Sequence, residues 1–212
     1  MKSEEFDVVI VANGQFPTHS IPLDILRKAR YVVACDGAIT SLQKAGIAAD
    51  VVIGDGDSVP EAFRHLLVHV DEQEDNDLTK ATRYCLANST LFSIHSSLKI
   101  AYLGCTGLRE DHTIGNISLL MRYYRELGIE GVMFTDYGIF IPAQGNRTFP
   151  SKLGQQVSIF NFGCTSILSE GLRWNSYAYD QWWQGTLNEA LGDSISFHAD
   201  GYYMVFQTYD VK

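Results

Sequence analysis

The first two-thirds of the chain alternates continuously apolar runs with segments whose apolar residues recur at helical spacing. The apolar runs are FDVVIVA, YVVAC, DVVIG, KIAYLGC and GVMFT, and each is too uniformly apolar for a strand with one face in water. Between them, LDILRKA, ITSLQKAG, PEAFRHLL, LTKATRYCLANS and DHTIGNISLLMRYYRELG have helical spacing. A further short run, LLVHV, reads as a strand. Such alternation predicts an α/β fold with a doubly wound, mostly parallel sheet.

The pattern changes near residue 141. The segment 141–156, IPAQGNRTFPSKLGQQ, is polar and holds two prolines and two glycines, so we interpret it as a linker. Beyond it, VSIFNFG, TSILSEGLRW, SISFHA and YYMVFQTYD alternate in polarity. Asp200 and Gly201, between the last two runs, predict a hairpin turn. We therefore expect an α/β domain over 1–143 and a small antiparallel β-sandwich over 144–212.

Acidic residues follow the ends of several predicted strands, where ligands bind in open α/β sheets. In chain order they are Asp36, Asp55, Asp57, Asp75, Asp77 and Asp111. In VVIGDGDSVP, two of these carboxylates stand two residues apart, so their charges repel. A shared cation would relieve that repulsion, and Mg²⁺ takes oxygen ligands. The pattern therefore predicts a magnesium site at one edge of the sheet.

Local structure offers other interpretations of the same residues. Ser58 with Glu61 fits a capping box, so part of this stretch could simply begin a helix. Asp77 could be an ordinary negative charge at a helix N-terminus. His112 lies in the turn before a helix, and both a ligand-facing and a structural role stay open for it.

Composition narrows the classes of function. The 212 residues carry a net charge of −9 with no basic run, which argues against a nucleic-acid-binding surface. No stretch is suited to secretion or long enough to span a bilayer. The four cysteines are scattered without a C-x-x-C pair, so we expect reduced packing residues in a cytoplasmic protein that does not bind membranes.

Four motifs in order carry a resemblance to a known family. They are ACDGAI, GDGDSV, EQEDNDLTKA and GCTGLREDHTIGN, and they resemble the signature set of thiamine pyrophosphokinases. GLRW and GTLNEALGDSISF resemble the S-N-E region of the family's C-terminal domain. The resemblance implies a catalytic α/β domain and a β-sandwich. It also implies transfer of the terminal diphosphate of ATP to the hydroxyl of thiamine, giving thiamine diphosphate and AMP. It further implies a homodimer, with thiamine between one subunit's catalytic edge and the other's sandwich.

The resemblance also implies roles for individual residues. The catalytic and Mg²⁺-binding residues would be Asp55, Asp57 and Asp77. The ATP-binding residues would be Asp36, Gln73, Thr79, Lys80, Arg109, Asp111 and His112. The thiamine-binding residues would be Thr186 and Asn188. Which group, if any, accepts the hydroxyl proton stays open, with Asp57 and Asp77 as the candidates.

The chain departs from the family pattern at three positions. Ala38 and Leu108 stand where the family usually has glycine, and Leu187 replaces the serine of S-N-E. Leucine adopts a positive φ only at a cost, so we expect the turn at Leu108 to be shaped differently. The effect of these changes on affinity and specificity stays open, as do regulation and which aromatic residue stacks on thiamine.

Rival interpretations differ in how much they explain. A haloacid dehalogenase-type phosphatase needs its nucleophilic Asp directly after the strand, whereas Gly54 intervenes here. An EF-hand loop fails because Val59 and Leu66 occupy ligand positions. Two alternatives stay open: a non-catalytic regulator that binds thiamine or nucleotide on the same fold, and a diphosphokinase for another hydroxymethyl heterocycle such as a pterin.

Overall fold

The computed structural model describes residues 6–92 and 97–211. The chain divides into two compact units, Met1–Asp136 and Tyr137–Lys212. The first unit alternates strands and helices, as the sequence predicts. Its elements are β1 (Val8–Val11), α1 (Ser20–Arg27), β2 (Val32–Cys35), α2 (Ala38–Lys44), β3 (Val51–Gly54), the 3₁₀ helix η2 (Glu61–Leu66), β4 (Leu67–His69), α3 (Asp77–Ala87), the 3₁₀ helix η3 (Ser89–Phe92), β5 (Lys99–Leu103), α4 (Glu110–Leu127) and β6 (Glu130–Phe134).

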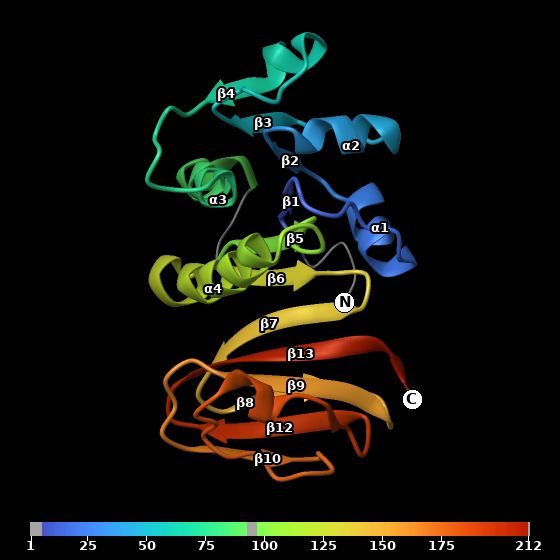
Figure 1. Ribbon diagram of the computed structural model, residues 1–212, viewed down its shortest axis with the longest axis vertical. Helices are drawn as coiled ribbons and strands as arrows, with labels where there is room; N and C mark the ends of the chain where they lie inside the picture. Colours follow the sequence, from blue (N-terminus) through green and yellow to red (C-terminus); the bar gives the residue numbers. More distant parts are fainter. Residues whose placement is uncertain (1–5, 93–96, 212) are drawn as a thin grey trace. The chain divides into compact units, whose positions relative to one another are not determined.

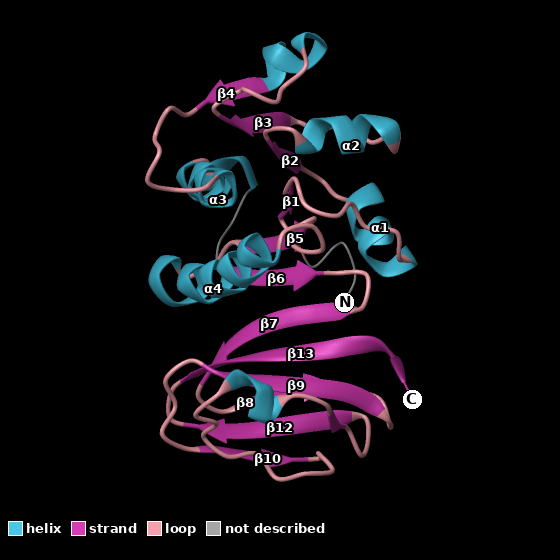
Figure 2. Ribbon diagram, viewed as in Figure 1, coloured by secondary structure: helices cyan, strands magenta, loops and turns pink. Residues whose placement is uncertain are grey.

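Six parallel strands of this unit lie in the order β6-β5-β1-β2-β3-β4. Helices α1 and α2 lie on one side of the sheet, and α3 and α4 lie on the other (Figures 1 and 2). Every residue of β1, β2 and β3 is buried, because helices cover both faces. The predicted doubly wound, mostly parallel sheet is therefore confirmed.

The strand order reverses beside β1. The chain runs outward from β1 to β4 and then returns to place β5 on the other side of β1. The two loops that leave β1 and β5 are held together by backbone hydrogen bonds. Gly14 N donates to Gly104 O over 2.7 Å, and Gln15 N donates to Thr106 O over 2.8 Å. This reversal is the topological switch point at which open α/β sheets bind ligands.

The predicted helix PEAFRHLL is only a six-residue 3₁₀ helix, η2, with no buried residue. Its N-cap is Pro60, which makes no side-chain capping bond, so the capping box predicted for Ser58 and Glu61 does not form. Instead, Ser58 N donates a hydrogen bond to Oδ2 of Asp36. Because none of its residues is buried, η2 is not packed into the core.

The second unit is an antiparallel β-sandwich, as predicted. One sheet has the order β11-β9-β13-β7 and the other has the order β10-β12-β8. Phe197 and Tyr203, one from each sheet, pack with ring centroids 5.3 Å apart. The elements are β7 (Gly138–Gln144), β8 (Arg147–Pro150), β9 (Gln155–Asn161), β10 (Ile167–Glu170), the 3₁₀ helix η4 (Trp182–Gly185), β11 (Asn188–Glu189), β12 (Ser194–Ala199) and β13 (Tyr202–Val211).

The predicted linker over 141–156 is wrong. That segment contains the end of β7, the whole of β8 and the start of β9. Gly145, with φ +64°, makes the turn between β7 and β8. Pro150 ends β8, which is an edge strand of its sheet, where the missing N–H of proline leaves no gap in the ladder. Proline and glycine mark turns and edges inside the sandwich here.

The hairpin predicted at Asp200 and Gly201 is also wrong, because β12 and β13 belong to different sheets. The carboxylate of Asp200 accepts hydrogen bonds from Thr165 N over 2.9 Å and Ser166 N over 3.0 Å. It therefore fixes a neighbouring loop, while the turn carries the chain from one sheet to the other.

All four cysteines lie within the described ranges, where they are buried and free of disulfides, in agreement with the sequence. None of the helices in the described part of the chain combines the length and the apolar character needed to cross a bilayer.

The contact between the β1 and β5 loops generates a stability prediction. A Cβ added at Gly14 would lie 2.3 Å from Gly104 O and 2.8 Å from Thr106 O. We expect Gly14→Ala to lower the free energy of unfolding by about 1–3 kcal/mol, the usual cost of overpacking, as measured by urea denaturation. The matched control is Gly115→Ala in α4, where a Cβ would meet open space. That change should be neutral or raise the free energy by up to about 1 kcal/mol. Equal stability of both variants would show that the loop contact is dispensable.

Candidate active site

A cleft of about 450 Å³ opens at the switch point. Its walls come from the loops after β1, β2, β3 and β5 and from the first turns of α3 and α4. The polar residues of its wall include Asn13, Asp36, Ser58, Asn76, Asp77, Arg109, His112 and Asn116. Four of the residues predicted from the sequence, Asp36, Asp77, Arg109 and His112, therefore lie around one cleft, although they come from three separate segments of the chain.

Asp36 directly follows β2 and is only 7% exposed. Its φ of +39° is a conformation that aspartate tolerates better than most residues. Oδ2 accepts a hydrogen bond from Ser58 N over 3.2 Å, whereas Oδ1 is buried without a partner among the described residues. A buried oxygen of this kind is costly unless a ligand satisfies it. Gly54 makes room for Asp36, since a Cβ there would lie 2.9 Å from the Asp36 Cβ.

Asp77 is the first residue of α3, which confirms that it stands at a helix N-terminus. Its Oδ1 lies 3.5 Å from Nζ of Lys80, whose side chain is only 4% exposed. Burial raises the pKa of the Asp77 carboxyl, and the charges of Asp36 and Asp55 raise the pKa further, against the opposing effect of Lys80. The charges of Asp36 and Asp55 therefore repel the charge of Asp77, whereas the repulsion predicted between Asp55 and Asp57 stays a prediction.

Asp55 and Asp57 form a tight turn in which Asp57 N donates to Oδ1 of Asp55 over 3.1 Å. Neither residue is part of the cleft wall. Among residues 6–92 and 97–211, no three His, Cys, Asp or Glu side chains are already gathered as ligands of one metal ion. The magnesium set of Asp55, Asp57 and Asp77 therefore stays a prediction. The chemistry of the site fits a hard cation, because its ligands are carboxylate oxygens and Oδ1 of Asp36 lacks a partner.

Arg109 is the N-cap of α4 and lies at the mouth of the cleft with its side chain largely exposed. Its guanidinium donates to both carboxylate oxygens of Asp111, over 3.1 Å from Nε and 2.6 Å from a terminal nitrogen. This pairing raises the pKa of Arg109 and lowers the pKa of Asp111. Because Nε and one terminal nitrogen already donate to Asp111, only the remaining N–H groups of the guanidinium are available to bind a phosphate. The cleft thus has carboxylates at one side and a fixed cation at the other.

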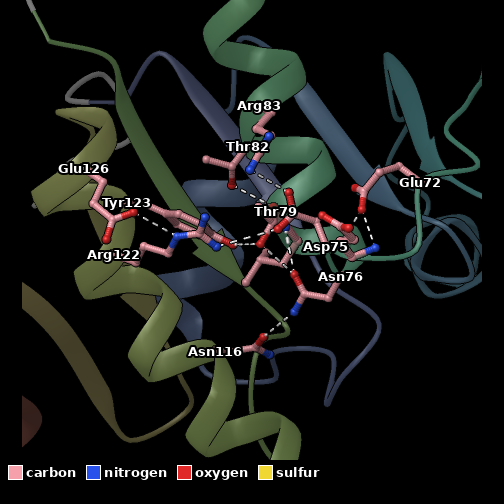
Figure 3. A network of polar contacts seen from close by, with 12 residues as sticks. Glu72, Asp75, Asn76, Thr79, Thr82, Arg83, Asn116, Arg122, Tyr123 and Glu126 are labelled. Atoms are coloured by element: carbon pink, nitrogen blue, oxygen red, sulfur yellow. Dashed lines mark hydrogen bonds and ion pairs between the residues drawn. The ribbon is translucent and has the colours of Figure 1, made fainter.

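Four predicted ATP-binding residues, Gln73, Thr79, Lys80 and Asp111, do not line the cleft, and Asp111 pairs with Arg109 instead. Gln73 donates to the carbonyl of Asp71 and is exposed. Thr79 is 1% exposed, and its hydroxyl bonds to Asn76 Oδ1 over 2.9 Å and to the Tyr123 hydroxyl over 2.6 Å (Figure 3). Lys80 is buried beside Asp77. Their contact with ATP stays a prediction, and the structure gives Thr79 a part in fixing the start of α3.

Asp75, which the sequence placed with the other acidic residues, serves a different purpose. It is nearly buried and pairs with Arg83 over 2.8 Å and with Arg122 over 3.7 Å (Figure 3). Both of its oxygens are therefore neutralised by arginines from α3 and α4. Asp75 anchors the loop before α3, while Asp77, two residues later, contributes to the cleft.

Sequence reasoning missed three amides of the cleft wall, those of Asn13, Asn76 and Asn116. Asn13 directly follows the strand β1 in VANGQ, so the strand-end rule that identified Asp36 would have found it had amides been included. Asn116 lies two turns inside α4, where no strand end marks it. Its side chain is 8% exposed and belongs to a partly buried network of hydrogen bonds.

The second unit has a separate pocket of about 170 Å³ that includes Trp174, Tyr177, Tyr179, Thr186 and Asn188. The Asn188 amide donates to Trp174 O over 2.8 Å, and its Oδ1 accepts from Trp174 N over 3.2 Å. The Thr186 hydroxyl donates to Trp183 O over 2.7 Å. Both predicted thiamine-binding residues thus line an aromatic pocket, and Asn188 holds the backbone of one of its aromatic residues.

The departures from the family pattern have structural consequences. Leu108 does not adopt a positive φ, whereas Gly107 before it does, with φ +91°. Leu187, in contrast, has φ +64° and an exposed side chain. This strained leucine stands directly before Asn188, beside the aromatic pocket.

The chain therefore combines a doubly wound α/β unit that has an acidic cleft at its switch point with a β-sandwich unit. Two models of known protein families match this chain. Residues 23–130 match the thiamin pyrophosphokinase catalytic domain, and residues 138–206 match the thiamin pyrophosphokinase substrate-binding domain. The chain therefore belongs to the thiamin pyrophosphokinase family, and the resemblance carried by its motifs is confirmed.

Individual relatives agree with this assignment. The chain is 32% identical over 106 residues to thiamin pyrophosphokinase 1 of Caenorhabditis elegans, an alignment that spans 47% of this chain and 43% of that protein. The fold resembles thiamine pyrophosphokinase from Bacillus subtilis, with a TM-score of 0.75, 19% identity and coverage of 96% and 99% of the two chains. It also resembles thiamin pyrophosphokinase from Candida albicans, with a TM-score of 0.79, 14% identity and coverage of 98% and 90%.

The electrostatics of Asp77 generate a prediction about stability. Because the folded-state pKa is raised, the stability that Asp77 contributes is fully present when it is protonated and is lost as the pH rises through that pKa. Asparagine resembles the protonated acid, so Asp77→Asn should raise the free energy of unfolding at pH 7 in EDTA. The gain should shrink as the pH falls toward 4, as measured by urea denaturation.

The control for this prediction is Asp111→Asn. The pKa of Asp111 is lowered by Arg109, so its replacement should bring no gain in stability at pH 7. If Asp77→Asn instead loses stability at pH 7, attraction by Lys80 outweighs both burial and the repulsion between carboxylates.

Proposed function

We propose that this chain is a Mg²⁺-dependent thiamine diphosphokinase that transfers the terminal diphosphate of ATP to the hydroxyl of thiamine, releasing AMP. One observation carries the proposal: Asp36, Asp77, Arg109 and His112 share the switch-point cleft of a chain whose two units match the family's catalytic and substrate-binding domains. The carboxylate side of the cleft suits a metal ion, and the Arg109 side suits phosphate.

In the proposed reaction, the thiamine hydroxyl oxygen forms a bond to the β-phosphorus of ATP. The bond from that phosphorus to the oxygen bridging the α- and β-phosphates breaks, and AMP leaves with the electron pair. Such a transfer needs in-line positioning and neutralisation of the developing charge more than covalent help. Arg109 would bind phosphate oxygens through the guanidinium N–H groups that do not donate to Asp111. Asp77, with Asp55 and Asp57, would hold Mg²⁺, which when bound neutralises charge on the phosphates.

The hydroxyl proton requires an acceptor or solvent. Of the two predicted acceptors, Asp77 is the better placed, because it forms part of the cleft wall whereas Asp57 does not. We therefore assign the proton to Asp77 in this proposal.

Thiamine, which accepts the diphosphate, would bind the aromatic pocket of the second unit. There, Trp174 and Tyr177 offer exposed rings to a cationic heterocycle. We further propose a homodimer in which this pocket faces the cleft of the partner subunit. The exposed side chains of Trp174, Trp183 and Leu191 in the second unit support association with another surface.

The first test of the proposal concerns the products. Incubation with thiamine, Mg²⁺ and ATP should give AMP and thiamine diphosphate in equal amounts, resolved by mass spectrometry, and EDTA should abolish both. Production of ADP with thiamine monophosphate would contradict the reaction. Binding of ATP or thiamine without turnover would favour the regulator, and AMP formed only with another hydroxymethyl heterocycle would favour the related diphosphokinase.

The second test separates the two binding sites, with each variant serving as the control for the other. Arg109→Ala should raise KM for ATP about tenfold, because it removes a charge-assisted contact to phosphate, while KM for thiamine barely changes. Asn188→Ala should raise KM for thiamine about tenfold, since the loss of a polar contact costs roughly 1–2 kcal/mol and releases Trp174. Steady-state kinetics in both substrates measure the four values. If Asn188→Ala changes KM for ATP instead, the acceptor does not bind the second unit.

A further inference from the structure

Asn116 is a polar residue of α4 that is only 8% exposed. Its amide is satisfied at both ends. Nδ2 donates to the carbonyl of Cys105 over 2.8 Å, and Oδ1 accepts from Nδ2 of Asn76 over 3.3 Å. Cys105 belongs to the loop between β5 and α4 that leads to Arg109. One side chain in α4 is therefore bonded to the segments on two sides of the cleft.

The bond to Asn76 continues into α3. Asn76 is the N-cap of that helix, and its Oδ1 accepts from both the backbone N and the hydroxyl of Thr79, each over 2.9 Å. Figure 3 shows Asn116, Asn76 and Thr79 in line between the two helices. Asp77 lies within this capped turn. A continuous polar path thus runs from the β5–α4 loop through Asn116 to the turn that carries Asp77.

A second link between the helices does not reach the loop. The hydroxyls of Thr79 and Tyr123 are 2.6 Å apart. Burial raises the pKa of Tyr123, so it is a neutral phenol, and because the Thr79 hydroxyl donates to Asn76, Tyr123 must donate to Thr79. Tyr123 also packs against Tyr102 with ring centroids 5.8 Å apart. This link joins α3 to α4 and the core, without a bond to Cys105.

We infer that Asn116 is a positioning residue for the diphosphate transfer proposed above, on which this inference rests. By tying the N-cap of α3 to the β5–α4 loop, Asn116 fixes Asp77 and Arg109 at a set separation across the cleft. A transfer that requires a metal-binding carboxylate and a phosphate-binding guanidinium at once depends on that separation. Small misplacements of such groups can lower a rate by about a hundredfold.

The test compares Asn116→Ala with Tyr123→Phe, because both changes remove hydrogen bonds from the same buried network and only the first cuts the bond to the loop. Asn116→Ala should lower kcat about 10- to 100-fold while both KM values change less than threefold. Tyr123→Phe should change kcat less than twofold, even if its melting temperature falls as much as that of Asn116→Ala. Asn116→Asp keeps the shape and the acceptor of the side chain but loses the donor to Cys105, so it should also lower kcat. This variant replaces Asn116→Ala in the test if Asn116→Ala does not fold.

Hydrogen exchange followed by mass spectrometry gives a readout that does not depend on turnover. Asn116→Ala should speed exchange both at residues 77–80 and at residues 105–109, whereas Tyr123→Phe should leave 105–109 unchanged. If the wild-type chain makes no thiamine diphosphate, the proposed function fails, and exchange alone decides whether Asn116 couples the two segments.

Three results would overturn the inference. One is a kcat loss in Asn116→Ala no larger than in Tyr123→Phe. Another is a raised KM with unchanged kcat, which would make Asn116 a binding contact. The last is exchange that speeds up in only one of the two segments.

Discussion

The mutual repulsion of partly buried carboxylates is the constraint on which the first unit's cleft depends. Asp36 after β2 and Asp77 at the start of α3 lie around one cleft, and burial together with neighbouring charges raises the pKa of Asp77. Lys80 offsets part of this charge, because its Nζ lies 3.5 Å from Oδ1 of Asp77, while Arg109 is paired with Asp111. The remaining negative charge favours a hard cation, and a bound cation would in turn attract a polyphosphate. The hydrogen bonds around Asn76 and Asn116 hold α3 in place against the repulsion.

Much of the fold could be predicted from the sequence, because helices cover both faces of the parallel sheet and so force its strands to be continuously apolar. β1, β2 and β3 follow this rule residue by residue. The second unit was harder, since glycine and proline have similar signatures in linkers and in edge strands. Gly145 and Pro150 indicated a linker but belong to a turn and an edge strand. At Asp200, the side chain bonds to a distant loop, which no local turn rule contains.

The site was predictable to the extent that strand ends determine it. Asp36 was found because residues that follow parallel strands gather at one edge. The ordered motifs indicated Arg109 and the family, and the comparisons then confirmed the family. The sequence could not show that Asp75 forms ion pairs while Asp77 lies in the cleft wall. The arginines of α3 and α4 that pair with Asp75 come close to it only in the folded state. Asn116 was missed for the same reason: its partners lie 11 and 40 residues away.

In the function proposed above, the switch-point cleft binds a metal–nucleotide complex through its carboxylates. Crystals grown with Mn²⁺ and α,β-methylene-ATP, whose α–β linkage cannot be cleaved by the transfer, would locate the metal by its anomalous scattering. We expect a Mn²⁺ peak in this cleft that contacts a carboxylate oxygen of Asp77 and phosphate oxygens of the nucleotide. The metal–oxygen distances should be about 2.0–2.2 Å, close to the short distances typical of Mg²⁺. A metal and triphosphate bound elsewhere on the chain, with Asp77 in contact with neither, would contradict the proposal.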